Sequence, residues 1–233
     1  MAKIMSLNLW GYEDWNNRKD NIVSLLNYER PDVIALQEVR LLHDSPMQIS
    51  QSNFITKVCG LPYYVFAPTY RRTNLKSDVS HGLAFYSKYP INSVEIYHLK
   101  QGEGFKEKCS ALIISLEING KAVDICNVHF GNTDKESDLH IKEFIGFLKH
   151  RGLRPIIMGD FNIINIDNYL GTSLLAGYVS SSQCLNYVSM PKINNRLDYI
   201  IAPEAKYKMS EVRCSEAYVS DHRALFAEIN IYE

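Results

Sequence analysis

Side chains with oxygen or imidazole donors recur where apolar, strand-like runs of this sequence end. They are Asn8, Glu38, Asn127, His129, Asp160, Asn162, Asp198, Asp221 and His222. A rigid scaffold can present such strand-end residues to a ligand. Carboxylate and amide oxygens are the ligands that Mg²⁺ and Mn²⁺ prefer, and histidine transfers protons near neutral pH. The pattern therefore predicts one site that holds a divalent cation, Mg²⁺ with Mn²⁺ as the alternative, and performs acid–base chemistry.

The metal ligands are expected near both ends of the chain. Glu38 follows the apolar run 33–36, so a strand exit there can present its carboxylate to a cation. The alternative is an ordinary surface glutamate. Asn8 and Asp221 are expected as supporting or water-mediated ligands. Asn8 has a second interpretation, as a cap on the turn at Trp10 and Gly11.

Asp160 and Asn162 follow the short apolar strand expected over 156–158. In an extended chain both side chains face one side while Phe161 turns into the core, so a carboxylate and an amide face one substrate. The alternative is a turn without chemistry. Asn127 and His129 are spaced in the same way at another strand end, and Asn127 is expected to contact the substrate.

Asp198 stands between Leu197 and Tyr199 in an apolar strand. A carboxylate in that setting needs a charged or hydrogen-bonded partner. A structural salt bridge with Arg196 is one possible partner. His222 is the other, because a histidine that acts as a general acid or base usually needs a carboxylate to fix its tautomer.

Several short motifs occur in one order along nearly the whole chain. They are Leu36-Gln37-Glu38, Gly82-Leu83-Ala84, Ser87-Lys88-Tyr89-Pro90-Ile91, Asn127-Val128-His129, Gly159-Asp160-Phe161-Asn162, Arg196-Leu197-Asp198-Tyr199 and Ser220-Asp221-His222. In these motifs the chain resembles the endonuclease/exonuclease/phosphatase superfamily, which has the DNase I-like fold. Each motif alone is too short to be specific, and their common order carries the resemblance.

The resemblance implies a magnesium-dependent phosphoester hydrolase, of phosphodiesterase or nuclease type, in which water attacks phosphorus in line. It implies that Glu38 holds Mg²⁺, that Asp160 orients or deprotonates the attacking water, and that Asn162 donates to a phosphoryl oxygen. Asp198 then orients His222, and His129 lies near the scissile phosphate. Whether Asp160 or His222 takes the proton is left open. The alternatives are a phosphomonoesterase acting on a sugar or inositol phosphate and a non-catalytic binding module.

One motif discriminates within the superfamily. Abasic-site endonucleases carry Tyr-x-Pro-Asn where this chain has His129-Phe130-Gly131-Asn132. This departure argues against abasic-site repair. The Asn-x-His form resembles the branch of DNase I-like nucleases, sphingomyelinases, inositol-phosphate phosphatases, deadenylases and tyrosyl-DNA phosphodiesterases.

The expected elements predict an α/β (α+β) fold, a four-layer sandwich of two mixed β-sheets flanked by helices, in a single domain over residues 1–233. Helices are expected over 16–29, from a Ser45-Pro46 start to Gly60, and over 135–150. Strands are expected over 3–9, 33–37, 63–67, 83–87, 94–99, 111–118, 122–128, 156–158, 197–201 and 224–231. Asn119-Gly120 predicts a tight hairpin.

Composition excludes some classes of partner. A formal net charge of −1 shows no excess of basic residues of the kind that long nucleic acid attracts. Arg71, Arg72 and Lys76 form a basic stretch before Gly82, interpreted either as a loop in which Arg71 and Arg72 bind substrate phosphate or as a solvated loop. The five scattered cysteines suggest a reducing compartment. No apolar run reaches membrane-spanning length. We expect a cytoplasmic protein if Met1 is the natural start, and a removed signal peptide is the alternative. We also expect a monomer that acts on a nucleic acid, a nucleotide or a small phosphoester.

Overall fold

The computed structural model describes residues 1–43, 50–74, 77–102 and 108–232. These segments form two six-stranded mixed sheets, with strand orders β11-β12-β1-β2-β4-β3 and β5-β6-β7-β8-β10-β9. The strands of the first sheet are β1 Ala2–Asn8, β2 Val33–Leu42, β3 Tyr63–Asn74, β4 Ser77–Ser87, β11 Tyr207–Cys214 and β12 Leu225–Ile231. The strands of the second are β5 Ile91–His98, β6 Ser110–Ile118, β7 Lys121–His129, β8 Ile156–Asp160, β9 Tyr178–Ser180 and β10 Asp198–Pro203.

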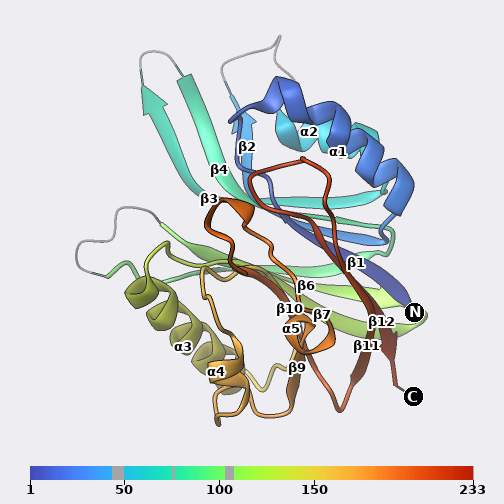
Figure 1. The fold of residues 1–233 in the computed structure, drawn as a ribbon, viewed down its shortest axis with the longest axis vertical. Coiled ribbons are helices and arrows are strands. Elements are labelled where there is room, and N and C mark those ends of the chain that lie inside the picture. Colours follow the sequence, from blue (N-terminus) through green and yellow to red (C-terminus); the bar gives the residue numbers. More distant parts are fainter. Residues whose placement is uncertain (44–49, 75–76, 103–107, 233) are drawn as a thin grey trace.

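Helices cover the outer face of each sheet (Figure 1). Helices α1 Trp15–Glu29 and α2 Gln51–Cys59 pack on the first sheet through the apolar cluster that contains Ile22 and Ile55. Helix α3 Asp134–His150 packs on the second sheet, where α4 Asp167–Leu170 also lies. The short helix α5 Ser181–Cys184 follows β9, and a 3₁₀ turn spans Pro191–Ile193. The four expected layers are therefore present.

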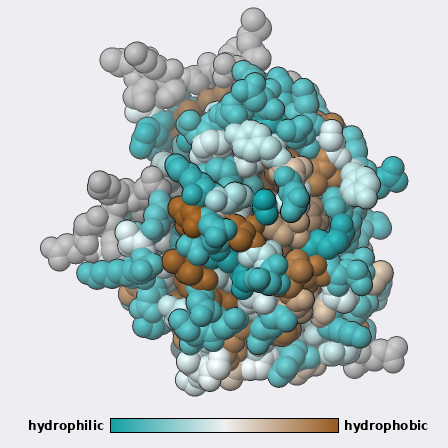
Figure 2. All heavy atoms as spheres, viewed as in Figure 1, coloured by the Kyte–Doolittle hydropathy of each residue, from teal (hydrophilic) through white to brown (hydrophobic). Residues whose placement is uncertain are grey.

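The inner faces of the two sheets form the central core. Buried residues from both sheets, such as Phe85 and Ile114, belong to one apolar cluster. A polar link also crosses between the sheets, because Asn127 on β7 donates to the carbonyl oxygens of Leu36 and Ala84 and accepts from Gln37. The exterior seen in Figure 2 is mostly hydrophilic, with small groups of hydrophobic residues. No helix in the described segments combines the length and apolarity needed to cross a membrane.

Local signals located several elements correctly. Asn119 and Gly120 have φ of 53° and 74°, the left-handed pair that a type I′ hairpin requires, and they join β6 to β7 as expected. Helices α1 and α3 begin within one residue of their expected starts and end at the expected residues. Gly60 ends α2 in a left-handed conformation. The expected Ser45-Pro46 start lies outside the described residues, and the described helix begins at Gln51 with Ser50 as its cap.

Other elements differ from expectation. Arg71 and Arg72 do not lie in a loop, because β3 and β4 pair as a long hairpin up to Asn74 and Ser77. Lys76, the third member of the basic stretch, lies outside the described residues. Strand β2 continues five residues beyond the expected end at Gln37, to Leu42. Strands β9 and β11 were not expected. The first is short, and β11 alternates buried residues with charged ones at a sheet edge, so neither carries a strong apolar signal.

Gly159 on β8 is expected to tolerate no side chain. Its φ is 141°, and an added Cβ would lie 2.1 Å from the carbonyl oxygen of Val128 on the neighbouring strand. Gly159→Ala should therefore lower the free energy of unfolding by about 3 kcal/mol. Gly146 in α3 is the matched control, because nothing lies within 4 Å of its added Cβ. Gly146→Ala should raise stability by about 0.5–1 kcal/mol in the same urea titration. Equal stability of the two variants would contradict the close approach of β7 and β8.

Candidate active site

The chemistry-bearing residues meet where the carboxyl ends of two parallel strand pairs face each other. In the first sheet β1 runs parallel to β2, and in the second β7 runs parallel to β8. Asn8, His129 and Asp160 are the last residues of β1, β7 and β8, and Asp198 is the first of β10. The register places His129 beside Asp160, and Asp160 beside Asp198. The sandwich thus brings together residues that lie up to 190 positions apart, Asn8 and Asp198.

The Asp160 carboxylate is at the centre of this group. Its Oδ2 lies 3.0 Å from Nδ2 of Asn8, 3.7 Å from Nε2 of His129 and 3.8 Å from Nε2 of His222. Asp160 is only 1% exposed. Burial raises the pKa of its carboxyl, and the neighbouring His222 opposes that rise. One oxygen is therefore surrounded by an amide and two imidazoles.

His222 is held by Asp198. Nδ1 of His222 lies 2.8 Å from Oδ2 of Asp198, and both residues are buried. Burial alone would favour the neutral ring, but the charges of Asp198 and Asp160 outweigh it and raise the pKa of His222 to about 10. The alternative salt bridge between Asp198 and Arg196 is not formed, because the Arg196 guanidinium donates to Tyr187 and Asn186. The second carboxylate oxygen of Asp198 is buried and has no hydrogen-bond partner among the described residues.

The sequence predicts Glu38 at a strand exit, but the structure does not place it there. The strand continues, and its pairing with β4 shifts register between Leu36 and Val39. Glu38 adopts a left-handed φ of 53° at this bulge. Bulges commonly redirect a side chain next to a site. Here the bulge places Oε1 of Glu38 3.1 Å from Nδ2 of Asn8 and 4.0 Å from Nε2 of His129.

Asn8 caps the turn after β1, and its amide nitrogen also contacts the two carboxylates of the site. Its Oδ1 accepts from the backbone N–H of Trp10, which is the cap on the turn. Its Nδ2 donates to both Glu38 and Asp160. In this orientation Asn8 presents a donor and not an oxygen ligand to the site. It therefore supports the two carboxylates, and direct coordination of a metal by Asn8 would require the amide to turn over.

Glu38 and Asp221 provide a donor set that fits a divalent cation. Both line the same pocket. Burial raises the pKa of the Asp221 carboxyl, and the Glu38 charge adds to that rise. No lysine or arginine of the described segments forms an ion pair with either carboxylate. The donor atoms of Asp160, Asp198 and His222 also lie within 4.8 Å of one another. That cluster fits a cation less well, because Asp198 and His222 already bind each other.

Asn162 is not extended. Its φ is 51°, and its backbone N–H donates to Oδ1 of Asp160, which closes a turn after β8. Its side-chain nitrogen donates to the Phe130 carbonyl oxygen and to Asn132. Phe161 is buried, as expected. Asn162 thus ties this turn to the loop after β7, and its donation to a phosphoryl oxygen stays a prediction.

The expectation that Asn127 contacts substrate is wrong. Its side chain has no exposed surface. It lies two residues before the end of β7 and points between the sheets. There its amide nitrogen and its amide oxygen both form the hydrogen bonds of the polar link described above. His129, at the last position of the strand, does line the pocket. Of this pair, only His129 lines the pocket.

Arg71 and Arg72 are not among the residues that line the pocket. Arg71 forms an ion pair with Asp78 across the β3–β4 hairpin, and Arg72 is exposed. The same hairpin instead contributes Tyr70 and His81 to the pocket, with Arg40 from β2. Tyr70 and Arg40 were not expected at the site. Arg40 is two positions after Glu38, and that spacing in a strand was the available signal.

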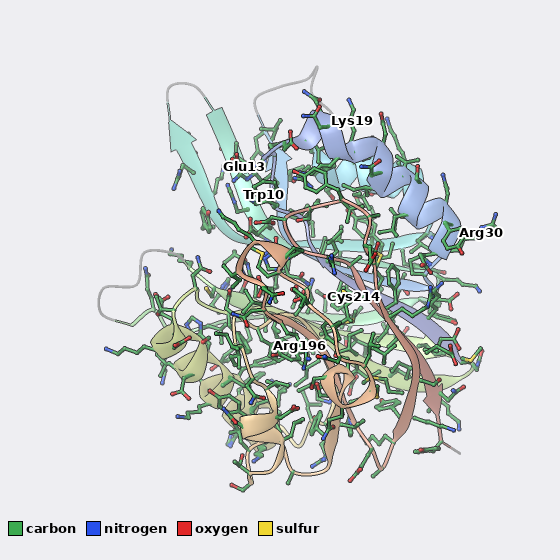
Figure 3. The ribbon with its side chains drawn as sticks, in the orientation of Figure 1. Trp10, Glu13, Lys19, Arg30, Arg196 and Cys214 are labelled. Carbon is green, nitrogen blue, oxygen red and sulfur yellow. The ribbon has the colours of Figure 1, made fainter. Side chains whose placement is uncertain are left out.

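The pocket over this group has a volume of about 580 Å³. Glu38, His129 and Asp221 line it, while Asp160 and His222 lie buried beneath them at 1% and 6% exposed. Trp10 and Glu13 form part of its wall, in the loop between β1 and α1 (Figure 3).

The buried Arg18 guanidinium holds the loops around this pocket. It donates to the carbonyl oxygens of Trp10, Gly11 and Glu13 in the loop after β1. It also donates to that of Val219, just before Asp221 and His222. Arg18 therefore fixes two loops of the site to each other.

The order and placement of these residues agree with a known family. The model of the Endonuclease/Exonuclease/phosphatase family matches residues 5–222. The chain belongs to this family. No curated protein sequence matches the chain.

Solved structures of the endonuclease/exonuclease/phosphatase family share the fold of this chain. A family protein from Leptotrichia buccalis C-1013-b is 19% identical with a TM-score of 0.74, covering 99% of this chain and 100% of that one. The mannosyl-6-phosphatase Bt3783 of Bacteroides thetaiotaomicron VPI-5482 is 15% identical, with a TM-score of 0.72 over 99% and 100%. The human Nocturnin catalytic domain with bound sulfate is 16% identical, with a TM-score of 0.73 over 99% and 94%. At these identities the likeness establishes the DNase I-like fold.

Proposed function

We propose that this protein is a Mg²⁺-dependent phosphodiesterase that hydrolyses its substrate by in-line attack of water on phosphorus. The observation that carries the proposal is the Asp160 carboxylate, held within 3.0–3.8 Å of Asn8, His129 and His222 beneath a pocket lined by Glu38 and Asp221. A buried acid–base group beside an oxygen-rich cation site is the arrangement that metal-assisted hydrolysis requires.

The chain supplies orientation and proton transfer. Asn8 donates to Asp160 and so fixes the carboxylate that orients or deprotonates the attacking water. Asp198 binds Nδ1 of His222, which leaves Nε2 to face the site, where the imidazolium stabilises charge on the phosphoryl group. His129 faces the same carboxylate from the second sheet and completes the pocket for the phosphoryl oxygens. Asn162 holds the loop that follows His129.

Glu38 and Asp221 would hold the cation, with Asn8 as a support for Glu38. A bound Mg²⁺ supplies Lewis acidity that neutralises charge on the phosphoryl oxygens. The carboxylate oxygens of Glu38 and Asp221 favour Mg²⁺ or Mn²⁺ over Zn²⁺.

A phosphomonoesterase is the second candidate, because one protein of the same fold is named a mannosyl-6-phosphatase. The sequence feature Asn127-Val128-His129 fits the Asn-x-His branch and does not separate the two activities. Hydrolysis of bis(4-nitrophenyl) phosphate and of 4-nitrophenyl phosphate, each with Mg²⁺, Mn²⁺ or EDTA, tests them directly. Cleavage of the diester that EDTA removes supports the proposal. Cleavage of the monoester alone would replace it with the second candidate, and turnover that survives EDTA would refute metal dependence.

Glu38→Gln is expected to raise the Mg²⁺ concentration for half-maximal activity by about tenfold or more, since one charged ligand is lost. Mg²⁺ titration of activity measures this. Glu117→Gln, which removes an exposed carboxylate from β6, is the control and should leave the titration curve unchanged. An unaltered Mg²⁺ requirement in Glu38→Gln would remove Glu38 from the metal site.

A further inference from the structure

A row of three side chains extends the pocket beyond the catalytic group. Arg40 on β2 pairs with His81 on β4, and His81 pairs with Tyr70 on β3. All three line the pocket. The row lies just past two register shifts, at Leu36/Val39 in β2 and at Pro68/Tyr70 in β3. The row of Arg40, His81 and Tyr70 therefore lies next to the bulge that directs Glu38 toward the metal site.

Arg40 supplies the positive charge of this row. Its side chain is half-buried, and its Nε is buried without a hydrogen-bond partner among the described residues. No carboxylate in those segments forms an ion pair with it. Other arginines of the chain are engaged, since Arg71 pairs with Asp78 and Arg18 donates to four carbonyl oxygens. A guanidinium left with unused donors in a pocket is suited to a planar oxyanion such as phosphate.

The surroundings fix Arg40 in place. An added Cβ at Gly11 would lie 2.4 Å from Nε of Arg40, so the guanidinium packs directly on the Gly11 backbone. His81, the cross-strand partner of Arg40, stacks on Tyr70, with ring centroids 4.7 Å apart and planes 13° apart. Burial, with the Arg40 charge beside it, lowers the pKa of His81 to about 4. The imidazole is then neutral at pH 7, and Arg40 is the cation of the row.

We propose that Arg40 binds a second phosphate group of the substrate, next to the phosphoester that is hydrolysed. The substrate class is then a phosphodiester that carries at least one further phosphate, as an oligonucleotide does. This inference rests on the proposed function, and it adds a specificity-determining residue outside the catalytic group. His81 and Tyr70 line the same part of the pocket as Arg40.

Turnover of the dinucleotide thymidylyl-(3′→5′)-thymidine, with and without a terminal phosphate, tests the inference. The wild-type enzyme should cleave the 5′- or the 3′-phosphorylated dinucleotide with a kcat/KM at least about tenfold above that of the unphosphorylated one. Arg40→Met should abolish this preference. Arg40→Lys, which retains the charge without the planar fork, should keep part of it. Arg30→Met is the charge-matched control, because Arg30 is exposed at the end of α1 far from Trp10 (Figure 3). This variant should keep the full preference for the phosphorylated dinucleotide. No preference in the wild type, or a preference that survives Arg40→Met, would overturn the inference.

Calorimetric binding of thymidine 3′,5′-bisphosphate and thymidine 5′-monophosphate, in Mg²⁺, tests Arg40 without turnover. The wild type and Arg30→Met should each bind the bisphosphate at least about tenfold more tightly than the monophosphate. Arg40→Met should bind the two ligands with equal affinity. Metal-dependent diester cleavage with no advantage from the second phosphate would refute the Arg40 site and leave the proposed function. A bisphosphate advantage that depends on Arg40, without diester cleavage, would support the site and refute the proposed function.

Discussion

Asp160→Asn is expected to lower kcat about 10³-fold, with KM changed much less, because proton transfer by a positioned group contributes about 10²–10⁴-fold. The replacement preserves the shape of the side chain but removes the charge that faces His129 and His222. It also replaces an acceptor of the Asn8 amide by a group that can present a competing donor. The loss should appear in the chemical step, since Asp160 is almost fully buried beneath the residues that line the pocket.

Single-turnover and steady-state rates, measured at saturating Mg²⁺, separate this effect from a loss of metal. Asp20→Asn is the matched control, since Asp20 is an exposed carboxylate on α1. The unfolding transition of Asp160→Asn must be recorded beside its activity, because a buried carboxylate is replaced. A variant that folds and retains more than about a tenth of the wild-type kcat would exclude Asp160 from the proton-transfer role.

Asp198→Asn and His222→Asn are each expected to lower kcat by about 10²–10³-fold, and the double variant should be no worse than the poorer single variant. The reason is that Asp198 has one side-chain contact of consequence, the 2.8 Å hydrogen bond to Nδ1 of His222. Without the carboxylate, nothing fixes the ring or its tautomer. Without the ring, the carboxylate has no group to orient. Residues that act as a unit show losses that do not add.

A double-mutant cycle in kcat measures that coupling. The same cycle in the free energy of unfolding should give a coupling of about 1–3 kcal/mol, since both groups are buried and each single variant leaves its partner unpaired. Independent, multiplicative losses of activity would show that His222 acts without Asp198. A second cycle between Asp198 and Glu117, which is exposed on β6, should show no coupling in either quantity.

The local sequence determined much of the fold. Asn119-Gly120 encodes its hairpin because both residues tolerate positive φ, and the ends of α1 and α3 follow from apolar periodicity and from residues that stop a helix, such as Pro31. The order of short polar motifs was sufficient to recognise the family that the chain belongs to. Each of these signals lies within a few residues of the feature that it specifies.

The shape of the site depended on contacts between distant strands. The bulge that turns Glu38 into the pocket is a property of how β2 pairs with β4, and it cannot be read from the apolar run that precedes it. Asn127 and His129 lie two positions apart on β7, yet contacts with the first sheet bury Asn127.

Among the basic residues, the sequence favoured the cluster at Arg71 and Arg72, but cross-strand partners decide which charge remains available. Asp78 pairs with Arg71 across the hairpin, while Arg40 lies in the pocket without a carboxylate partner in the described segments. The sequence by itself determined the family, the layers and the list of reactive side chains. Only the tertiary structure decided which of them face the pocket, because burial and pairing are set by residues far apart in the chain.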